Sequence, residues 1–211
     1  MLANRFKQET GFEGLIDFDI STARFSTFEG GFPDLIFPAA SDTVQARQVC
    51  NQIVDRILPY LQIPREQLSL ESIGGDSRVL RAQYRQRVNG YEIEGGGRFR
   101  ISYNYNLNRT VIVNGLVQID PTPVTPRITE EEARRIFYNN VTIPDNRKED
   151  RYYQPNDLKL MYCYERMNSD TNSYTTPQRY RLAWKSFAAE RIFIIDAISG
   201  EIMLNIYSRM P

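Results

Sequence analysis

The sequence predicts an α+β protein with two units, in each of which one helix packs on an antiparallel sheet. A helical pattern followed by strand-like runs occurs twice along the 211 residues. Between the two occurrences lie Pro121, Pro123 and Pro126. Proline interrupts both helices and central strands, so we expect a boundary there, with units at residues 1–126 and 127–211.

In the first unit, short strands at Leu15–Ile20 and Arg24–Glu29 precede a helix. Apolar residues recur at helical spacing from Ser41 onward, with Ser41 or Asp42 as the N-cap. Pro59 is expected to end or kink this helix near Leu58, because proline lacks the N–H that the helix needs. Alternating patterns then predict strands at Leu68–Ile73, Arg78–Val88, Arg98–Tyr105 and Thr110–Ile119.

The second unit begins with a short helix and ends in an antiparallel meander. Thr129 and Glu132 have the spacing of a capping box, and an apolar stripe follows them. A strand is predicted at Leu158–Tyr164. Arg179–Tyr207 then holds three strand-like runs, of which the last two are joined by a tight turn at Ser199 and Gly200.

The composition narrows the class of protein. With 41% hydrophobic and 25% charged residues, the chain has the balance of a globular protein rather than a disordered one. No apolar run approaches the roughly 20 residues that a membrane-spanning helix needs. The formal net charge is zero, so the bulk charge does not indicate binding to nucleic acid or to an anionic membrane.

The chain contains no histidine, which excludes a Ser-His-Asp triad, a Cys-His pair and an HExxH zinc site. Pairs of carboxylates at Asp17 with Asp19 and at Glu92 with Glu94 leave a hydrolase hypothesis open, although we interpret them as solvated strand faces. Cys50 and Cys163 are interpreted as buried thiols, with a disulfide as the alternative. We expect no enzyme activity, no metal and no cofactor.

Arginines form one candidate binding surface. Only four of the 26 basic residues are lysines, and arginine side chains suit the recognition of carboxylates. In strands, alternate residues share a face. If the two strands that carry them are neighbours, five arginines line one sheet surface that could dock an acidic partner: Arg81, Arg85, Arg87, Arg98 and Arg100. The alternative is an ordinary solvated face in which acidic residues on adjacent strands pair with them.

Three motifs carry a family resemblance. The run Asp196-Ala197-Ile198-Ser199-Gly200-Glu201-Ile202 resembles the closing hairpin of the PepSY domain, with Ser199 where threonine is usual. Upstream, Tyr84–Ile93 and Val111–Gly115 resemble segments of the fungalysin/thermolysin propeptide domain. The resemblance spans Tyr84 to Ile202 and implies a propeptide-like first unit and a PepSY-like second unit, both of cystatin-like architecture.

The resemblance implies a non-catalytic module that binds and inhibits, or helps to fold, a thermolysin-like zinc metalloprotease. It also implies export to the periplasm or the exterior, although Met1–Arg5 has no apolar segment of a signal peptide. In such families the C-terminal end runs toward the protease metal, which makes Ser208, Arg209 and Met210 candidate contacts. The chain would be a pro-region cut from a precursor or a free-standing relative. The alternative function is that of an extracellular binding or scaffold protein that has kept the fold without a protease partner.

Overall fold

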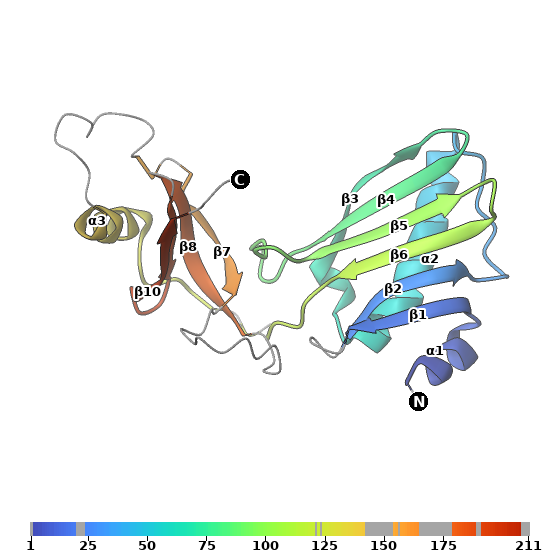
Figure 1. Cartoon of the computed structure of the whole chain (residues 1–211), viewed down its shortest axis with the longest axis horizontal. Helices are drawn as coiled ribbons and strands as arrows, with labels where there is room; N and C mark the ends of the chain where they lie inside the picture. Colours follow the sequence, from blue (N-terminus) through green and yellow to red (C-terminus); the bar gives the residue numbers. More distant parts are fainter. Residues whose placement is uncertain are drawn as a thin grey trace. The chain divides into compact units, whose positions relative to one another are not determined.

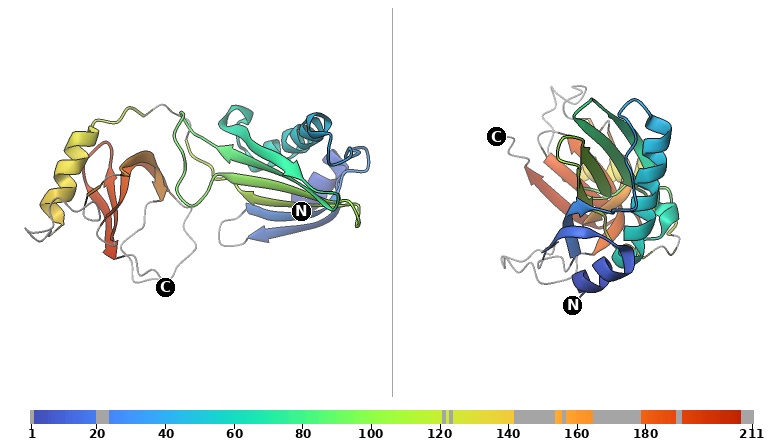
Figure 2. Two further views of the ribbon diagram at one scale, coloured as in Figure 1. Left: turned by 90° about the horizontal axis from the view of Figure 1, so that it is seen from above. Right: turned by 90° about the vertical axis from the view of Figure 1, so that its right-hand side faces the viewer.

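The computed structural model describes residues 2–19, 24–120, 122, 124–141, 154–155, 157–164, 179–188 and 191–207. The chain separates into two compact units, shown in Figures 1 and 2. Unit 1 comprises Met1–Arg87 and Gly95–Gln118, and unit 2 comprises Val88–Glu94 and Ile119–Pro211.

Unit 1 is a six-stranded antiparallel sheet with two helices. Its strands lie in the order β1-β2-β6-β5-β4-β3. In chain order its elements are α1 (Leu2–Thr10), β1 (Glu13–Asp19), β2 (Arg24–Gly31), α2 (Thr43–Leu61), the short 3-10 helix η1 (Arg65–Gln67), β3 (Leu68–Gly75), β4 (Val79–Gln86), β5 (Arg98–Asn104) and β6 (Arg109–Gly115).

Helix α2 begins where the sequence predicts it and ends later. The Asp42 carboxylate caps it by accepting a hydrogen bond from the Gln45 N–H at 3.0 Å. Of the two expectations for Pro59, an end of the helix near Leu58 is wrong, because the helix continues to Leu61. A proline in the last turn removes only one helical hydrogen bond, and burial of Leu58 and Leu61 in the core holds that turn in place.

One face of the unit 1 sheet forms the core. Helix α2 lies along this face, as Figures 1 and 2 show. Its buried stripe packs with the inward side chains of the sheet, among them Tyr84, Phe99, Ile101 and Ile112. Helix α1 adds Phe6, whose ring lies 5.3 Å from that of Phe28. Among the described residues, no helix of unit 1 covers the opposite face, which we call the outer face.

Unit 2 is a helix on a four-stranded antiparallel sheet of order β10-β9-β8-β7. Its elements are α3 (Glu130–Asn140), β7 (Lys159–Tyr164), β8 (Tyr180–Ala188), β9 (Arg191–Asp196) and β10 (Ile202–Tyr207). The predicted capping box at Thr129 and Glu132 is present. Phe137 of α3 packs on Phe193 of β9 with ring centroids 5.3 Å apart. The predicted α+β class, with a helix on an antiparallel sheet in each unit, is confirmed.

The segment Val88–Glu94, between β4 and β5, pairs with the edge of β7. The Tyr162 N–H donates to the Glu92 carbonyl, and the Glu94 N–H donates to the Tyr162 carbonyl, both at 2.8 Å. The Glu94 carboxylate also pairs with the Lys185 ammonium at 2.5 Å. The predicted units were 1–126 and 127–211. In the structure this segment belongs to unit 2, and the later division falls between Gln118 and Ile119.

The motif that resembles PepSY builds the turn between β9 and β10. One oxygen of the buried Asp196 carboxylate accepts hydrogen bonds from the Ile198 and Ser199 N–H groups, at 2.8 and 2.9 Å. Gly200 has a φ of 76°, a left-handed conformation that glycine adopts without strain. The carbonyl of Ala197 accepts from the N–H groups of Arg127 and Ile128, so the turn holds the chain that leads into α3.

The charge of Asp196 is stabilised inside unit 2. Burial alone would raise its pKa, but hydrogen bonds from the Ser199 and Ile198 N–H groups and from Arg181 outweigh that effect. The pKa of Asp196 therefore lies below the ordinary value. A lowered pKa in the folded state stabilises the fold above the unfolded-state pKa of about 3.9, and this contribution is lost as the pH falls through the folded-state pKa.

We predict that Asp196→Asn lowers the free energy of unfolding of unit 2 by about 1–2 kcal/mol at pH 7, because a neutral amide accepts the turn hydrogen bonds more weakly. Urea unfolding followed by fluorescence measures this, since Trp184 is the single tryptophan and lies in unit 2. The difference from the wild type should shrink as the pH falls below the unfolded-state pKa of about 3.9 and then through the lower folded-state pKa of Asp196. A difference that stays the same as the carboxylate takes up its proton would contradict the assigned role of the charge.

Candidate functional site

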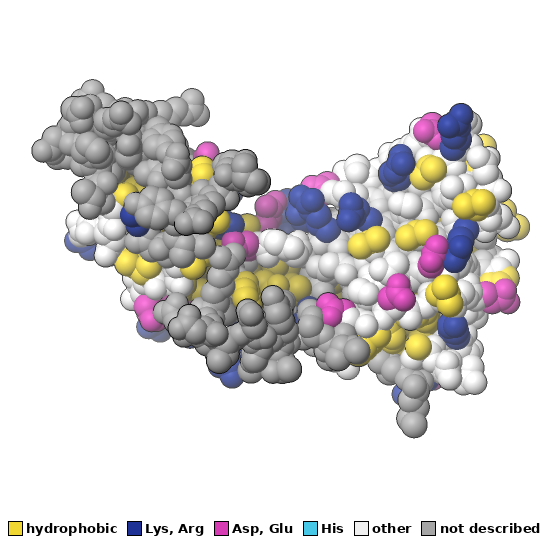
Figure 3. All heavy atoms as spheres, in the orientation of Figure 1, with side chains coloured by type: hydrophobic (Ala, Val, Ile, Leu, Met, Phe, Trp, Pro, Cys, Tyr) yellow, Lys and Arg dark blue, Asp and Glu magenta, His cyan; other side chains and the backbone are white. Residues whose placement is uncertain are grey.

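The structure brings four of the five predicted arginines together on the outer face of unit 1. Strands β4 and β5 are neighbours, with Arg85 directly opposite Arg98 and Arg81 opposite Ser102. Arg100 lies opposite Gln83. In Figure 3, basic side chains gather over the β4 and β5 part of this face. We call Arg81, Arg85, Arg98 and Arg100 the arginine face. Arg87, the fifth, is exposed but lies just beyond the end of β4.

One member of the arginine face has an acidic partner. The Arg85 guanidinium lies 3.2 Å from the Glu71 carboxylate. Hydrogen bonds from Gln83 and then from Arg85 lower the pKa of Glu71, which keeps it charged. The side chain of Arg85 is only 16% exposed, and its Nε has no hydrogen-bond partner. Arg85 is therefore half-buried and fixed in place on the sheet.

Arg98 and Arg100 differ from Arg85 because both are exposed and neither has an ion pair in the part of the chain that the structure describes. On the other side of β5, Arg98 is opposite Gly115 and Arg100 is opposite Val113. Like charges directly opposite each other on a sheet destabilise it, as at Arg85 and Arg98. The charge of Arg98 helps to lower the pKa of Glu71 through space. Neither Arg98 nor Arg100, however, forms an ion pair with an acid among the described residues.

The outer face also contains an arginine that pairs with an acidic residue on the adjacent strand. Arg109 of β6 lies 3.2 Å from Glu29 of β2, and both side chains are half-exposed. Such pairing explains Arg109 and Arg85. It does not explain Arg98 and Arg100, and it is these two side chains that make the face a candidate docking surface.

Those of the other predicted site residues that the structure describes do not form a second site. Ser208, Arg209 and Met210 lie outside the described residues. Asp17 and Asp19 lie on the edge strand β1, and Glu94 is occupied by Lys185. Cys50 and Cys163 are both buried and are not joined by a disulfide. Burial raises the pKa of the Cys50 thiol to about 12.

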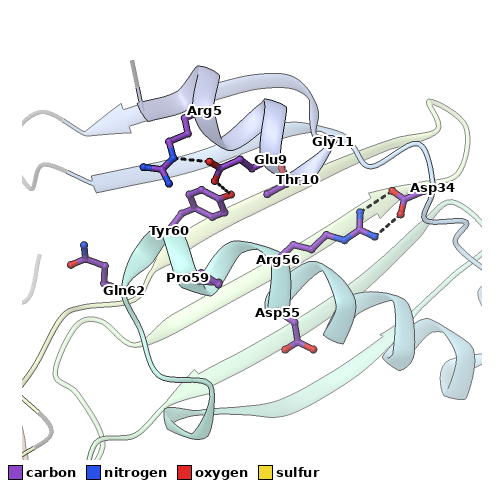
Figure 4. A pocket seen from close by; sticks show the side chains of 10 residues that line it. All are labelled: Arg5, Glu9, Thr10, Gly11, Asp34, Asp55, Arg56, Pro59, Tyr60 and Gln62. Carbon is purple, nitrogen blue, oxygen red and sulfur yellow. Dashed lines mark hydrogen bonds and ion pairs between the residues drawn. The ribbon is translucent and has the colours of Figure 1, made fainter.

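A cavity of about 850 Å³ lies between α1 and α2, and the sequence does not predict it because it does not predict α1. Figure 4 shows that four of its charged side chains bind one another in pairs, while Asp55 stands apart from them and pairs with Arg65 outside the cavity. Arg5 and the Tyr60 hydroxyl both donate to Glu9, at 2.7 and 2.6 Å, and Arg56 pairs with Asp34. Because these side chains already have hydrogen-bond partners, the cavity has fewer groups available to bind a ligand than the arginine face has.

The described residues contain no group of three or more His, Cys, Asp or Glu side chains that could hold a metal ion. Among the described helices, none is both long and apolar enough to span a membrane.

Comparisons with known proteins find little. No family model matches the sequence, and no curated protein matches it. Among solved structures, the C-terminal domain of YpeB from Bacillus megaterium is similar over 97% of this chain and 93% of that chain, with 12% sequence identity and a TM-score of 0.31. A TM-score this low supports no inference about function.

We predict that Arg98→Thr leaves the free energy of unfolding unchanged or raises it by about 0.5 kcal/mol, because it removes a like charge opposite Arg85 and introduces a good strand former. The matched variant Arg85→Thr should lower it by about 1 kcal/mol, since the bond to Glu71 and the packing of the arginine stem are both lost. Urea unfolding followed by far-UV circular dichroism measures both. A loss above about 1 kcal/mol for Arg98→Thr would show that this arginine serves the fold.

Proposed function

We propose that the chain is a non-catalytic protein-binding module whose arginine face docks an acidic partner surface. The observation that supports this most is the exposed pair Arg98 and Arg100, which form no ion pair among the described residues, beside the half-buried Arg85. These side chains stand on the central part of a sheet whose other face is packed against α2. The sheet therefore holds them on a rigid base, which reduces the conformational entropy that is lost when a partner binds.

Carboxylates of a partner would supply the missing counter-charge. Guanidinium groups form two parallel hydrogen bonds with a carboxylate, so the geometry as well as the charge selects an acidic surface. The positive surface would also speed the encounter with a negatively charged protein, and added salt would weaken that effect.

For the identity of the partner, we propose a thermolysin-like zinc metalloprotease that the chain inhibits or helps to fold, outside the cell or in the periplasm. The support is the resemblance of Tyr84–Ile93 and Val111–Gly115 to a protease propeptide, and of Asp196–Ile202 to PepSY. In this proposal Ser208, Arg209 and Met210 extend toward the protease cleft. An extracellular binding or scaffold protein is the second function, and it would use the same arginine face.

The test is inhibition of a purified thermolysin-like metalloprotease by the full chain. We predict that Arg98→Glu with Arg100→Glu raises the inhibition constant at least about tenfold, because two attractive contacts become repulsive. The matched control is Arg47→Glu, an exposed charge reversal on α2, which should leave the constant unchanged.

Equal inhibition constants for the double variant and the wild type would remove the arginine face from the proposal. If the wild-type chain fails to inhibit any such protease, the metalloprotease is not the partner. The second function would then predict salt-dependent binding of another acidic protein, which the double variant loses.

A further inference from the structure

The outer face of unit 1 is acidic at one edge and basic toward the other. Glu13, Leu15 and Asp17 of β1 are all exposed on it. The Asp17 carboxylate has no ion pair within the described residues, as is also true of Arg100. The face therefore presents an unpaired acid and an unpaired base, held on one rigid sheet.

A single row of cross-strand neighbours joins these two charges. Asp17 is opposite Thr27, Thr27 is opposite Val113, and Val113 is opposite Arg100. Neighbouring strands are about 4.8 Å apart, so Asp17 and Arg100 stand about 14 Å apart across the sheet. The midpoint of the row falls between Thr27 and Val113, which are small, uncharged side chains.

We propose that two copies of this chain associate through their outer faces, related by a two-fold axis that runs parallel to the strands between β2 and β6. This axis places Asp17 of each copy over Arg100 of the other. Thr27 of each copy meets Val113 of its partner. Two sheets packed face to face with self-complementary surfaces are a standard way to form a closed dimer.

The apolar side chains of the face fit this arrangement. Val113 is 38% exposed and Leu15 is 63% exposed, so both bury apolar surface when a second sheet covers them. Val113 lies next to the proposed axis, where contact between the copies is closest. The formal net charge of zero means that two copies do not repel each other through their overall charge.

The size of the face sets the expected strength. The proposed axis overlaps β1, β2, β6 and β5 of the two copies and leaves β4 and β3 outside the contact. Four strands about 4.8 Å apart and roughly seven residues long, at about 3.3 Å per residue, give a contact of roughly 440 Å² for each copy. Stable interfaces use about 800 Å² for each partner, so the dimer belongs with the weaker, concentration-dependent assemblies. This inference goes beyond the proposed function. Because both use Arg100, a dimer and an acidic partner exclude each other at this face.

The experiment is sedimentation equilibrium of the full chain and of two charge reversals, Asp17→Arg and Arg100→Glu. Each variant alone places like charges together twice in the dimer, so its dissociation constant should rise at least about tenfold. An equimolar mixture of the two restores opposite charges at both contacts, and the heterodimer should form with nearly the wild-type constant. Arg47→Glu is the control and should dimerise as the wild type does.

A wild-type chain that stays monomeric at millimolar concentration would overturn the proposal, as would a mixture of variants that stays monomeric while each remains folded by circular dichroism. If a reversal unfolds unit 1, Asp17→Asn and Arg100→Gln take its place. Each neutral variant should raise the dissociation constant about threefold. Mixing the two should restore it only in part, because the heterodimer regains one of the two Asp17–Arg100 pairs. Inhibition by Asp17→Arg is measured separately, because the proposed function does not use Asp17 and the two proposals can then fail independently.

Discussion

The structure of unit 1 depends on the fact that only one face of its six-stranded sheet is covered by the described helices. Residues of a strand point alternately to the two faces, so burial of Phe99 and Ile101 against α2 forces Arg98 and Arg100 outward. The side chains on the outer face only have to be compatible with solvent. On β5 the outward positions carry two arginines that form no ion pair with an acid among the described residues, and the proposed binding role rests on this pair.

Unit 2 shows why a motif can identify a fold without identifying a function. Asp196, Ala197 and Gly200 all serve the turn that they build. The Asp196 carboxylate holds two N–H groups, the Ala197 carbonyl holds the chain before α3, and Gly200 takes a left-handed conformation. None of them presents a reactive group to solvent. The resemblance based on these residues therefore concerns the architecture of the turn. The proposed partner has to be tested by changing the residues of the arginine face.

The sequence predicts those parts of the fold in which local pattern and tertiary packing agree. The α+β class, the capping box at Thr129 and most of the strand positions follow from such patterns. The sequence does not predict helix α1 because Phe6 is the one deeply buried side chain among its described side chains, and a single buried position gives no helical repeat. The pairing of Val88–Glu94 with β7, and the bulge that brings Glu71 to Arg85, depend on contacts between residues distant in sequence, which no local pattern records.

The most direct test of the central claim is arginine-selective dicarbonyl labelling read by mass spectrometry, since it reports which guanidinium groups an occupant covers. The account predicts that Arg98 and Arg100 react several-fold more slowly once a partner protein is bound, while the exposed Arg47 on α2 reacts at an unchanged rate. Unchanged labelling of Arg98 and Arg100 in a complex that has demonstrably formed would contradict it.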